Sequence, residues 1–204
     1  AVHVVPADVV VAQIEAVVGD IGVDAAKTGM LLSAAIVEAV AAAVEALEIP
    51  LLVVDPVMVA KSGDRLLEDD AVKAIKTQLL RHAYVVTPNC PEAEVLAGVA
   101  ITSLRDAREA ARRIHRLGST AVIVKGGHLA GPEVVDILFD GRDFFEFSGP
   151  RLDSSNTHGT GCTFGAAVTA SLAHGRPLEE ATRLAKTYVE GGIRHGIPLG
   201  HGHG

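Results

Sequence analysis

The sequence is poor in aromatic residues, in cysteine and in positive charge. Aromatic residues make up 3% of the 204 residues and tryptophan is absent, so alanine, valine, leucine and isoleucine must fill the core. The formal net charge of -7 argues against a nucleic-acid-binding surface. The only two cysteines, Cys90 and Cys162, indicate a reducing compartment and not a disulfide scaffold.

Long apolar runs and a leader sequence are also lacking. No uninterrupted apolar run reaches the roughly 18 residues that a membrane span requires, and no signal peptide is visible. We therefore expect a cytoplasmic protein that does not bind a membrane. The chain starts at Ala1 without methionine, in a run that resembles the middle of a longer sequence. An opening segment is therefore expected to be absent.

What is present is a regular alternation of strand and helix patterns. Buried-type strands are predicted at 23–28, 51–54, 84–87 and 120–124, and helices at about 8–21, 69–80 and 91–96 and from Ser33, Ser103 and Pro177 onward. Such alternation predicts a single α/β domain over residues 1–204, with a mainly parallel sheet and helices on both faces. Residues 134–139 and 144–147, joined through Asp140-Gly141, predict an antiparallel hairpin.

One glycine-containing segment, Asn156-Thr157-His158-Gly159-Thr160-Gly161-Cys162-Thr163, precedes an alanine-rich helix predicted over 164–173. Gly159 and Gly161 permit backbone angles that side chains forbid. The first amides of a helix are unpaired and carry partial positive charge. The segment therefore predicts an anion hole that cradles a phosphate.

Other interpretations of this segment stay open. It does not match the GxxxxGK[ST] loop, and it differs from the dinucleotide fingerprint because no apolar strand precedes it. A glycine-rich turn before a tightly packed helix explains the glycine spacing equally well. Cys162 is either a nucleophile at a helix N-terminus or, more ordinarily, a small buried thiol.

Polar residues follow several of the predicted strands. They are Thr28-Gly29-Met30, Asp55-Pro56, residues 89–92 and Lys125-Gly126-Gly127. Ligands of such sheets bind at the carboxyl ends of the strands. Asp55 and Glu92 are acidic groups able to hold Mg²⁺ directly or through water. A helix cap or a turn explains either carboxylate alone, but their repetition at successive strand ends favours a site.

Five stretches together resemble the hydroxymethylpyrimidine and phosphomethylpyrimidine kinases of thiamine biosynthesis. The resemblance covers essentially the whole chain in the order of the family. The stretches are Lys27-Thr28-Gly29-Met30-Leu31, residues 55–64 (DPVMVAKSGD), residues 87–94 (TPNCPEAE), residues 124–129 (VKGGHL) and residues 156–163 (NTHGTGCT).

The resemblance implies a ribokinase-like three-layer α/β/α fold and a homodimer. It also implies MgATP-dependent phosphorylation of 4-amino-5-hydroxymethyl-2-methylpyrimidine, and then of its monophosphate to the diphosphate. The partners would be this small pyrimidine and ATP, with no nucleic acid.

The resemblance further assigns roles to particular residues. Met30 and Val57 would line the pyrimidine pocket, and Asp55 and Glu92 would organise Mg²⁺ and phosphates. The groups implied to contact the nucleotide phosphates or act in transfer are Lys125, Asn89, Thr160, Gly159, Gly161 and Cys162. Cys162 stands where many relatives in the wider superfamily carry an aspartate base, and its thiolate would accept the hydroxyl proton, although its amide is the alternative functional group.

The sequence departs from the family at its beginning. The family's opening strand, with its glycine-rich segment and the glutamine-bearing stretch that follows, has no counterpart here. Either the native protein is longer than this sequence, or its pyrimidine pocket is incomplete and activity is lost. Three alternatives therefore stay open: a pyridoxal kinase of the same superfamily, a non-catalytic ligand-binding remnant, and a thiol-dependent hydrolase that uses Cys162 with His158.

Overall fold

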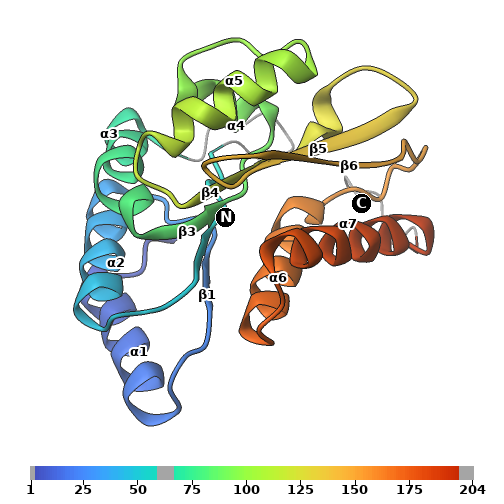
Figure 1. Ribbon diagram of the computed structural model, residues 1–204. Helices are drawn as coiled ribbons and strands as arrows, with labels where there is room; N and C mark the ends of the chain where they lie inside the picture. Colours follow the sequence, from blue (N-terminus) through green and yellow to red (C-terminus); the bar gives the residue numbers. More distant parts are fainter. Residues whose placement is uncertain (1–2, 59–66, 198–204) are drawn as a thin grey trace.

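The sheet has six strands, and their order across the sheet is their order along the chain (Figure 1). The computed structural model describes residues 3–58 and 67–197. The strands are β1 (Ala26–Thr28), β2 (Leu52–Val54), β3 (Ala83–Val86), β4 (Ala121–Val124), β5 (Glu133–Phe139) and β6 (Phe144–Pro150). Strands β1 to β4 are parallel, and β5 and β6 pair antiparallel as a hairpin. The predicted sheet and hairpin are confirmed.

Helices cover both faces of the sheet and complete three layers (Figure 1). The first face carries α1 (Ala7–Asp20), α2 (Ala34–Ala46), α3 (Asp69–Ala74), α4 (Cys90–Ala97) and α5 (Leu104–His115). The second face carries α6 (Thr160–Ala173) and α7 (Leu178–Arg194). This is the ribokinase-like arrangement that the resemblance implied.

The central strands are apolar on both sides because helices bury both sides. Val53 of β2, Val85 of β3 and Ile123 of β4 belong to the core beneath α6 and α7. Their neighbours Val54 and Val86 belong to the core beneath α2 to α5. Side chains alternate across a strand, so a strand covered on both faces is a continuous apolar run. Burial on both faces therefore explains why the predicted strands are continuous apolar runs in the sequence.

Two predicted elements differ in detail. The strand expected at 23–28 is shorter, and the helix expected at 69–80 consists of α3, a π-helix at Ile75–Leu79 and a 3₁₀ turn at Leu80–His82. These irregular turns bring Ile75, Leu79 and Leu80 all into the core. The spacing of apolar residues in the sequence does not distinguish a π-helical or 3₁₀ turn from a regular α-helix. In the described part of the chain, no helix has both the length and the apolar character to cross a membrane.

Candidate active site

Backbone hydrogen bonds continue the sheet just beyond the ends of the parallel strands. The amide of Asp55 donates to the carbonyl of Thr28 at 3.1 Å, and the amide of Thr87 donates to that of Val54 at 2.9 Å. The amide of Lys125 donates to the carbonyl of Pro88, also at 2.9 Å. Residues that are 27 to 37 positions apart are thereby aligned along one edge of the sheet.

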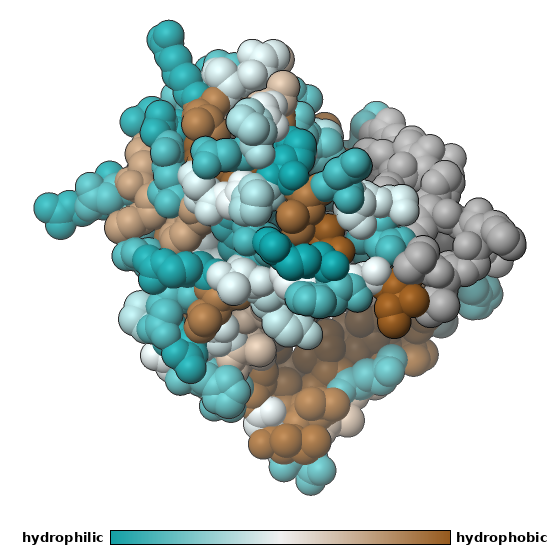
Figure 2. Space-filling model, turned by 90° about the vertical axis from the view of Figure 1, so that its right-hand side faces the viewer, coloured by the Kyte–Doolittle hydropathy of each residue, from teal (hydrophilic) through white to brown (hydrophobic). Residues whose placement is uncertain are grey.

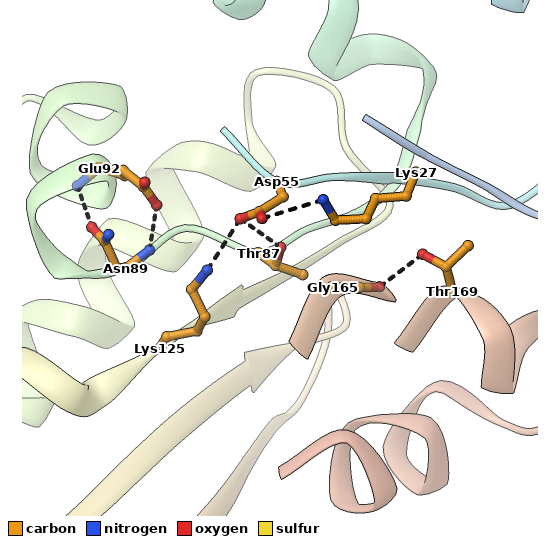
Figure 3. Close-up of polar contacts among 8 residues, drawn as sticks. All are labelled: Lys27, Asp55, Thr87, Asn89, Glu92, Lys125, Gly165 and Thr169. Carbon is orange, nitrogen blue, oxygen red and sulfur yellow. Dashed lines mark hydrogen bonds and ion pairs between the residues drawn. The ribbon is translucent and has the colours of Figure 1, made fainter. Parts of the chain in front are cut away.

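The centre of this edge is a buried carboxylate between two lysines (Figure 3). Asp55 is 2% exposed. Its Oδ1 accepts a hydrogen bond from Nζ of Lys125 at 3.1 Å, and its Oδ2 lies 3.5 Å from Nζ of Lys27. Thr87 adds a longer contact from its hydroxyl to Oδ1, at 3.5 Å. A carboxylate is tolerated at such a depth only when it is paired with opposite charge.

A second carboxylate, Glu92, lies at the start of α4. Asn89 caps this helix by accepting the amide of Glu92 at 2.9 Å, while Glu92 Oε2 accepts the amide of Asn89 at 2.8 Å. This reciprocal capping box holds Glu92 inside the protein, where it is 5% exposed. Burial raises the pKa of Glu92 to about 7, and the charge of Asp55 acts in the same direction against the opposing charge of Lys125.

Helix α6 begins at Thr160, four residues before the predicted start. Gly159 precedes it with φ of 75°, a left-handed conformation that favours glycine. The amide of Thr163 is the first to bond within the helix, to the carbonyl of Gly159 at 2.8 Å. Among residues 3–58 and 67–197, the amides of Thr160, Gly161 and Cys162 have no hydrogen-bond partner. We refer to these three groups as the α6 amides.

Gly161 is helical, so of the two glycines only Gly159 uses a backbone conformation that favours glycine. The lack of a side chain at Gly161 matters for another reason, because a Cβ there would lie 3.1 Å from Nζ of Lys125. One turn later, a Cβ on Gly165 would lie 2.8 Å from Cε of Lys27. The two glycines thus let α6 lie directly against the lysine–aspartate cluster.

A cavity of about 600 Å³ adjoins the start of α6. Its walls are the 156–163 segment and α7, through Asn156, His158, Thr160, Thr163, residues 187–189 and residues 191–193. This volume lies within the range typical of small-molecule sites. A phosphate at the α6 amides would therefore have space beside it for the rest of a ligand.

Comparison with known proteins agrees with this geometry. A family model described as phosphomethylpyrimidine kinase matches residues 1–204 of the chain. The chain belongs to the phosphomethylpyrimidine kinase family. The resemblance read from the five sequence stretches is confirmed, and the protein is a kinase.

Individual relatives of this kinase support the same assignment. The thiamine biosynthesis bifunctional protein ThiED of Geobacter sulfurreducens is 52% identical over 203 residues, which cover 100% of this chain and 41% of that protein. The hydroxymethylpyrimidine/phosphomethylpyrimidine kinase of Bacillus subtilis is 41% identical over 206 residues, which cover 100% of this chain and 75% of the relative. The chain therefore spans less than half of the bifunctional protein and three quarters of the single kinase.

A solved structure shows the same fold. The ADP complex of Bacillus subtilis pyridoxal kinase superposes with a TM-score of 0.91 at 37% identity. The superposition covers 98% of this kinase and 75% of that chain. The fold is therefore shared with a pyridoxal kinase.

Among the described residues, no side-chain hydrogen bond or ion pair joins Met30, Val57, Thr160 or Asn89 to the lysine–aspartate cluster, although Val57 and Asn89 meet it through the backbone. Met30 follows β1 and is 40% exposed, and Val57 is half-buried with its amide bonded to the carbonyl of Asp55 at 2.9 Å. The hydroxyl of Thr160 donates to the carbonyl of Thr157 at 2.9 Å. The amide oxygen of Asn89 is occupied by its capping bond. Residues 59–64 of the second stretch lie outside the described residues.

The two cysteines differ in exposure and in their surroundings. Cys162 is an exposed free thiol, so the interpretation of a small buried thiol is wrong for it. Within the described residues, no hydrogen bond joins its Sγ to His158, which lines the cavity. Cys90 is the buried thiol, and burial raises its pKa to about 11.

Lys27 is the site residue that motif reasoning passed over. It belongs to the first of the five family stretches, and its Nζ lies 3.5 Å from Oδ2 of Asp55. Its position in the sequence could have identified it. A lysine inside a short, partly buried strand requires a partner of opposite charge.

Proposed function

We propose that this kinase transfers the γ-phosphoryl group of ATP to 4-amino-5-hydroxymethyl-2-methylpyrimidine, and then to the resulting monophosphate. The observation that carries the proposal is the position of Lys125. Its ammonium group pairs with Asp55 and faces the first turn of α6, where the α6 amides have no protein partner among the described residues. Donors held in place before the reaction are the main contribution a protein makes to phosphoryl transfer.

Each group in the cluster has a role in this proposal. The α6 amides and Lys125 hold the migrating phosphoryl group, with the nucleotide in the adjoining cavity. Thr160, Asn156 and His158 line that cavity. Cys162 acts through its amide in binding, and its sulfur, which is exposed in the structure, is the proposed acceptor of the proton of the hydroxymethyl group. Met30 and Val57 lie on the segments after β1 and β2 and contact the pyrimidine.

The site also fits Mg²⁺. Oδ2 of buried Asp55 has no hydrogen-bond partner among the described residues. Glu92, with a pKa of about 7, is partly ionised at neutral pH. Mg²⁺ typically uses one or two carboxylates and completes its shell with water and phosphate oxygens. A site with only one or two protein carboxylates is consistent with the described part of the chain, in which no three His, Cys, Asp or Glu side chains are grouped so that they could hold a metal ion. When bound, the ion would neutralise phosphate charge.

The substrate choice is tested by comparing turnover of the pyrimidine, its monophosphate and pyridoxal with MgATP. Pyridoxal is the second candidate because the superposed structure is that of a pyridoxal kinase. We expect both pyrimidines to be phosphorylated with higher kcat/KM than pyridoxal, and Lys125→Ala to abolish turnover of both. A preference for pyridoxal contradicts the assignment. Nucleotide binding without turnover of any acceptor supports the ligand-binding remnant.

We propose further that the kinase is a homodimer. No residue of α1 is buried, and Val9, Val17 and Ile21 are exposed large apolar side chains on or directly after it. Figure 2 shows brown, hydrophobic residues at the lowest part of the molecule, the height at which α1 lies in Figure 1. Sedimentation velocity of the wild type and of Val17→Lys tests this, with a monomeric wild type as the contrary result.

A cytoplasmic location completes the proposal. ATP, the proposed donor, is a cytoplasmic metabolite, and both cysteines are free thiols of the kind that persist in reducing compartments. Localisation of a fluorescent fusion tests this point, and an extracytoplasmic signal would contradict it.

A further inference from the structure

Asp55 contacts two lysines, although one is enough to balance its charge. Lys125 makes a hydrogen bond of 3.1 Å to Oδ1. Lys27 lies 3.5 Å from Oδ2, which is longer than the 2.7–2.9 Å typical of a charge-assisted hydrogen bond. Oδ2 accordingly counts as unbonded within the described residues. The second lysine therefore forms an ion pair without a close hydrogen bond.

The ammonium group of Lys27 thus keeps donors that Asp55 does not use. A lysine carries three N–H donors, and no hydrogen bond from Lys27 to another described residue is recorded. Its side chain is 18% exposed, whereas that of Asp55 is 2% exposed. The group lies at the surface of the cluster, where a ligand has access to it.

The two lysines occupy different positions along α6. Lys125 lies against Gly161 in the first turn, and Lys27 lies against Gly165 in the second turn and close to Gly29. Four residues of a helix span about 6 Å. The ammonium groups are therefore directed at two successive places, one at the α6 amides and one beside the loop that carries Met30. Figure 3 shows Lys27 and Lys125 approaching Asp55 from opposite sides.

We propose that Lys27 binds the phosphate group of the phosphorylated acceptor and so determines the ability of the enzyme to carry out the second phosphorylation. This inference rests on the proposed function. In the second reaction an oxygen of the acceptor phosphate forms the new bond to the γ-phosphorus. The bond from that phosphorus to the bridging oxygen of ATP breaks and ADP leaves, so the dianionic acceptor loses no proton.

The charges explain why the second reaction needs another cation. A phosphate monoester brings about −1.5 to −2 charge at neutral pH beside the triphosphate and near Asp55. Lys125 is already engaged with Asp55 and faces the α6 amides. Lys27 supplies the additional positive charge on the acceptor side, whereas the uncharged hydroxymethyl group of the first acceptor does not require it.

The test compares Lys27→Met with the wild type on both acceptors, with Lys73→Met on the exposed face of α3 as the matched lysine control. Loss of a charged hydrogen bond predicts a fall of roughly 10- to 100-fold in kcat/KM for the monophosphate. The fall for the alcohol should be smaller, so the ratio of kcat/KM for the monophosphate to kcat/KM for the alcohol should decrease. Lys27→Arg should restore part of the loss, because it keeps the charge.

Binding of the monophosphate, measured by calorimetry without nucleotide, gives a second readout. We expect Lys27→Met to weaken this binding by roughly 10-fold or more and to leave ADP binding unchanged. Equal losses for both acceptors, or unchanged binding of the monophosphate, would overturn the inference. If the wild type phosphorylates neither acceptor, the proposed function fails, while the binding comparison still decides the role of Lys27.

Misfolding of the methionine variant does not block the test. Thermal unfolding establishes whether Lys27→Met is folded, and Asp55 keeps Lys125 as its partner in that variant. If the variant is unfolded, Lys27→Gln takes its place in both measurements, and the same outcomes apply.

Discussion

Asp136 of β5 joins Lys186 of α7 to the turn that follows Lys125. Oδ2 of Asp136 accepts a hydrogen bond from Nζ of Lys186 at 2.9 Å, and Oδ1 accepts the amide of Gly126 at 2.8 Å. Lys186 also donates to the carbonyl of Val134 at 3.0 Å. Asp136, Lys186 and Gly126 are buried and paired, so α7 is attached to the strand end that carries Lys125.

Removing one partner of this pair should be costly. Lys186→Met leaves the charge of Asp136 buried without compensation, and we expect a loss of about 3–5 kcal/mol in the free energy of unfolding. The double variant with Asp136→Asn should recover part of that loss. Urea unfolding measures the free energy of unfolding of the wild type, of Lys186→Met and of the double variant. A loss below about 1 kcal/mol for Lys186→Met would show that water replaces the lysine.

Glu92 should make both stability and activity depend on pH. Its pKa is about 4.5 when unfolded and about 7 in the folded protein. The folded state therefore holds the proton between these values, and its stability falls as pH rises from 4.5 through 7, by about 3 kcal/mol in total. Glu92→Gln keeps the capping geometry and removes this dependence. The free energies of unfolding of the wild type and of Glu92→Gln, each measured at pH 5 and at pH 8, give this pH dependence.

The same group predicts the pH profile of turnover. If the ionised carboxylate is needed for Mg²⁺, kcat/KM for MgATP should rise through an apparent pKa near 7, because this parameter reports the free enzyme. A flat profile between pH 6 and 8 would exclude a role for ionised Glu92.

Two glycines at the start of α6 should respond in opposite ways to alanine. Gly159→Ala places a side chain at φ of 75° and should cost about 1–2 kcal/mol of stability. Gly161→Ala is helical and should be neutral or slightly stabilising, but its methyl group would displace Nζ of Lys125 and lower turnover by roughly 10-fold or more. Gly19→Ala in α1, with open space around it, is the control for helix propensity. Unchanged turnover in Gly161→Ala would contradict the proposed position of Lys125.

A carboxylate at the wall of a polar cleft would tolerate Asp55→Asn with little effect on folding. Asp55 is instead buried between two lysines. We therefore expect a loss of more than about 100-fold in turnover together with about 1–3 kcal/mol of stability, since both cations lose their counter-charge. Adding Lys27→Met should restore stability and leave turnover low. Calorimetry and steady-state kinetics separate the two effects.

Residue spacing and turn-forming residues in the sequence correctly predicted the strands, the hairpin and the strand ends, because these features depend on interactions between residues close in sequence. The buried run at 51–54, the hairpin around Asp140-Gly141 and the strand ends that carry Asp55 and Lys125 all follow from periodicity and turn chemistry. Contacts across long stretches of sequence were not predictable in this way. The approach of Lys27 to Asp55 joins residues 28 positions apart, and that of Lys186 to Asp136 joins residues 50 apart. The early start of α6 at Thr160 was missed because its polar residues resemble a loop.

The sheet order has a consequence for how the molecule is made. Each strand pairs with the strand synthesised just before it, so hydrogen bonding proceeds along the nascent chain without waiting for a distant partner. Helices α6 and α7 follow all six strands along the chain and cover one face of the sheet. The α6 amides therefore meet the two lysines only after the strands that carry those lysines have been made.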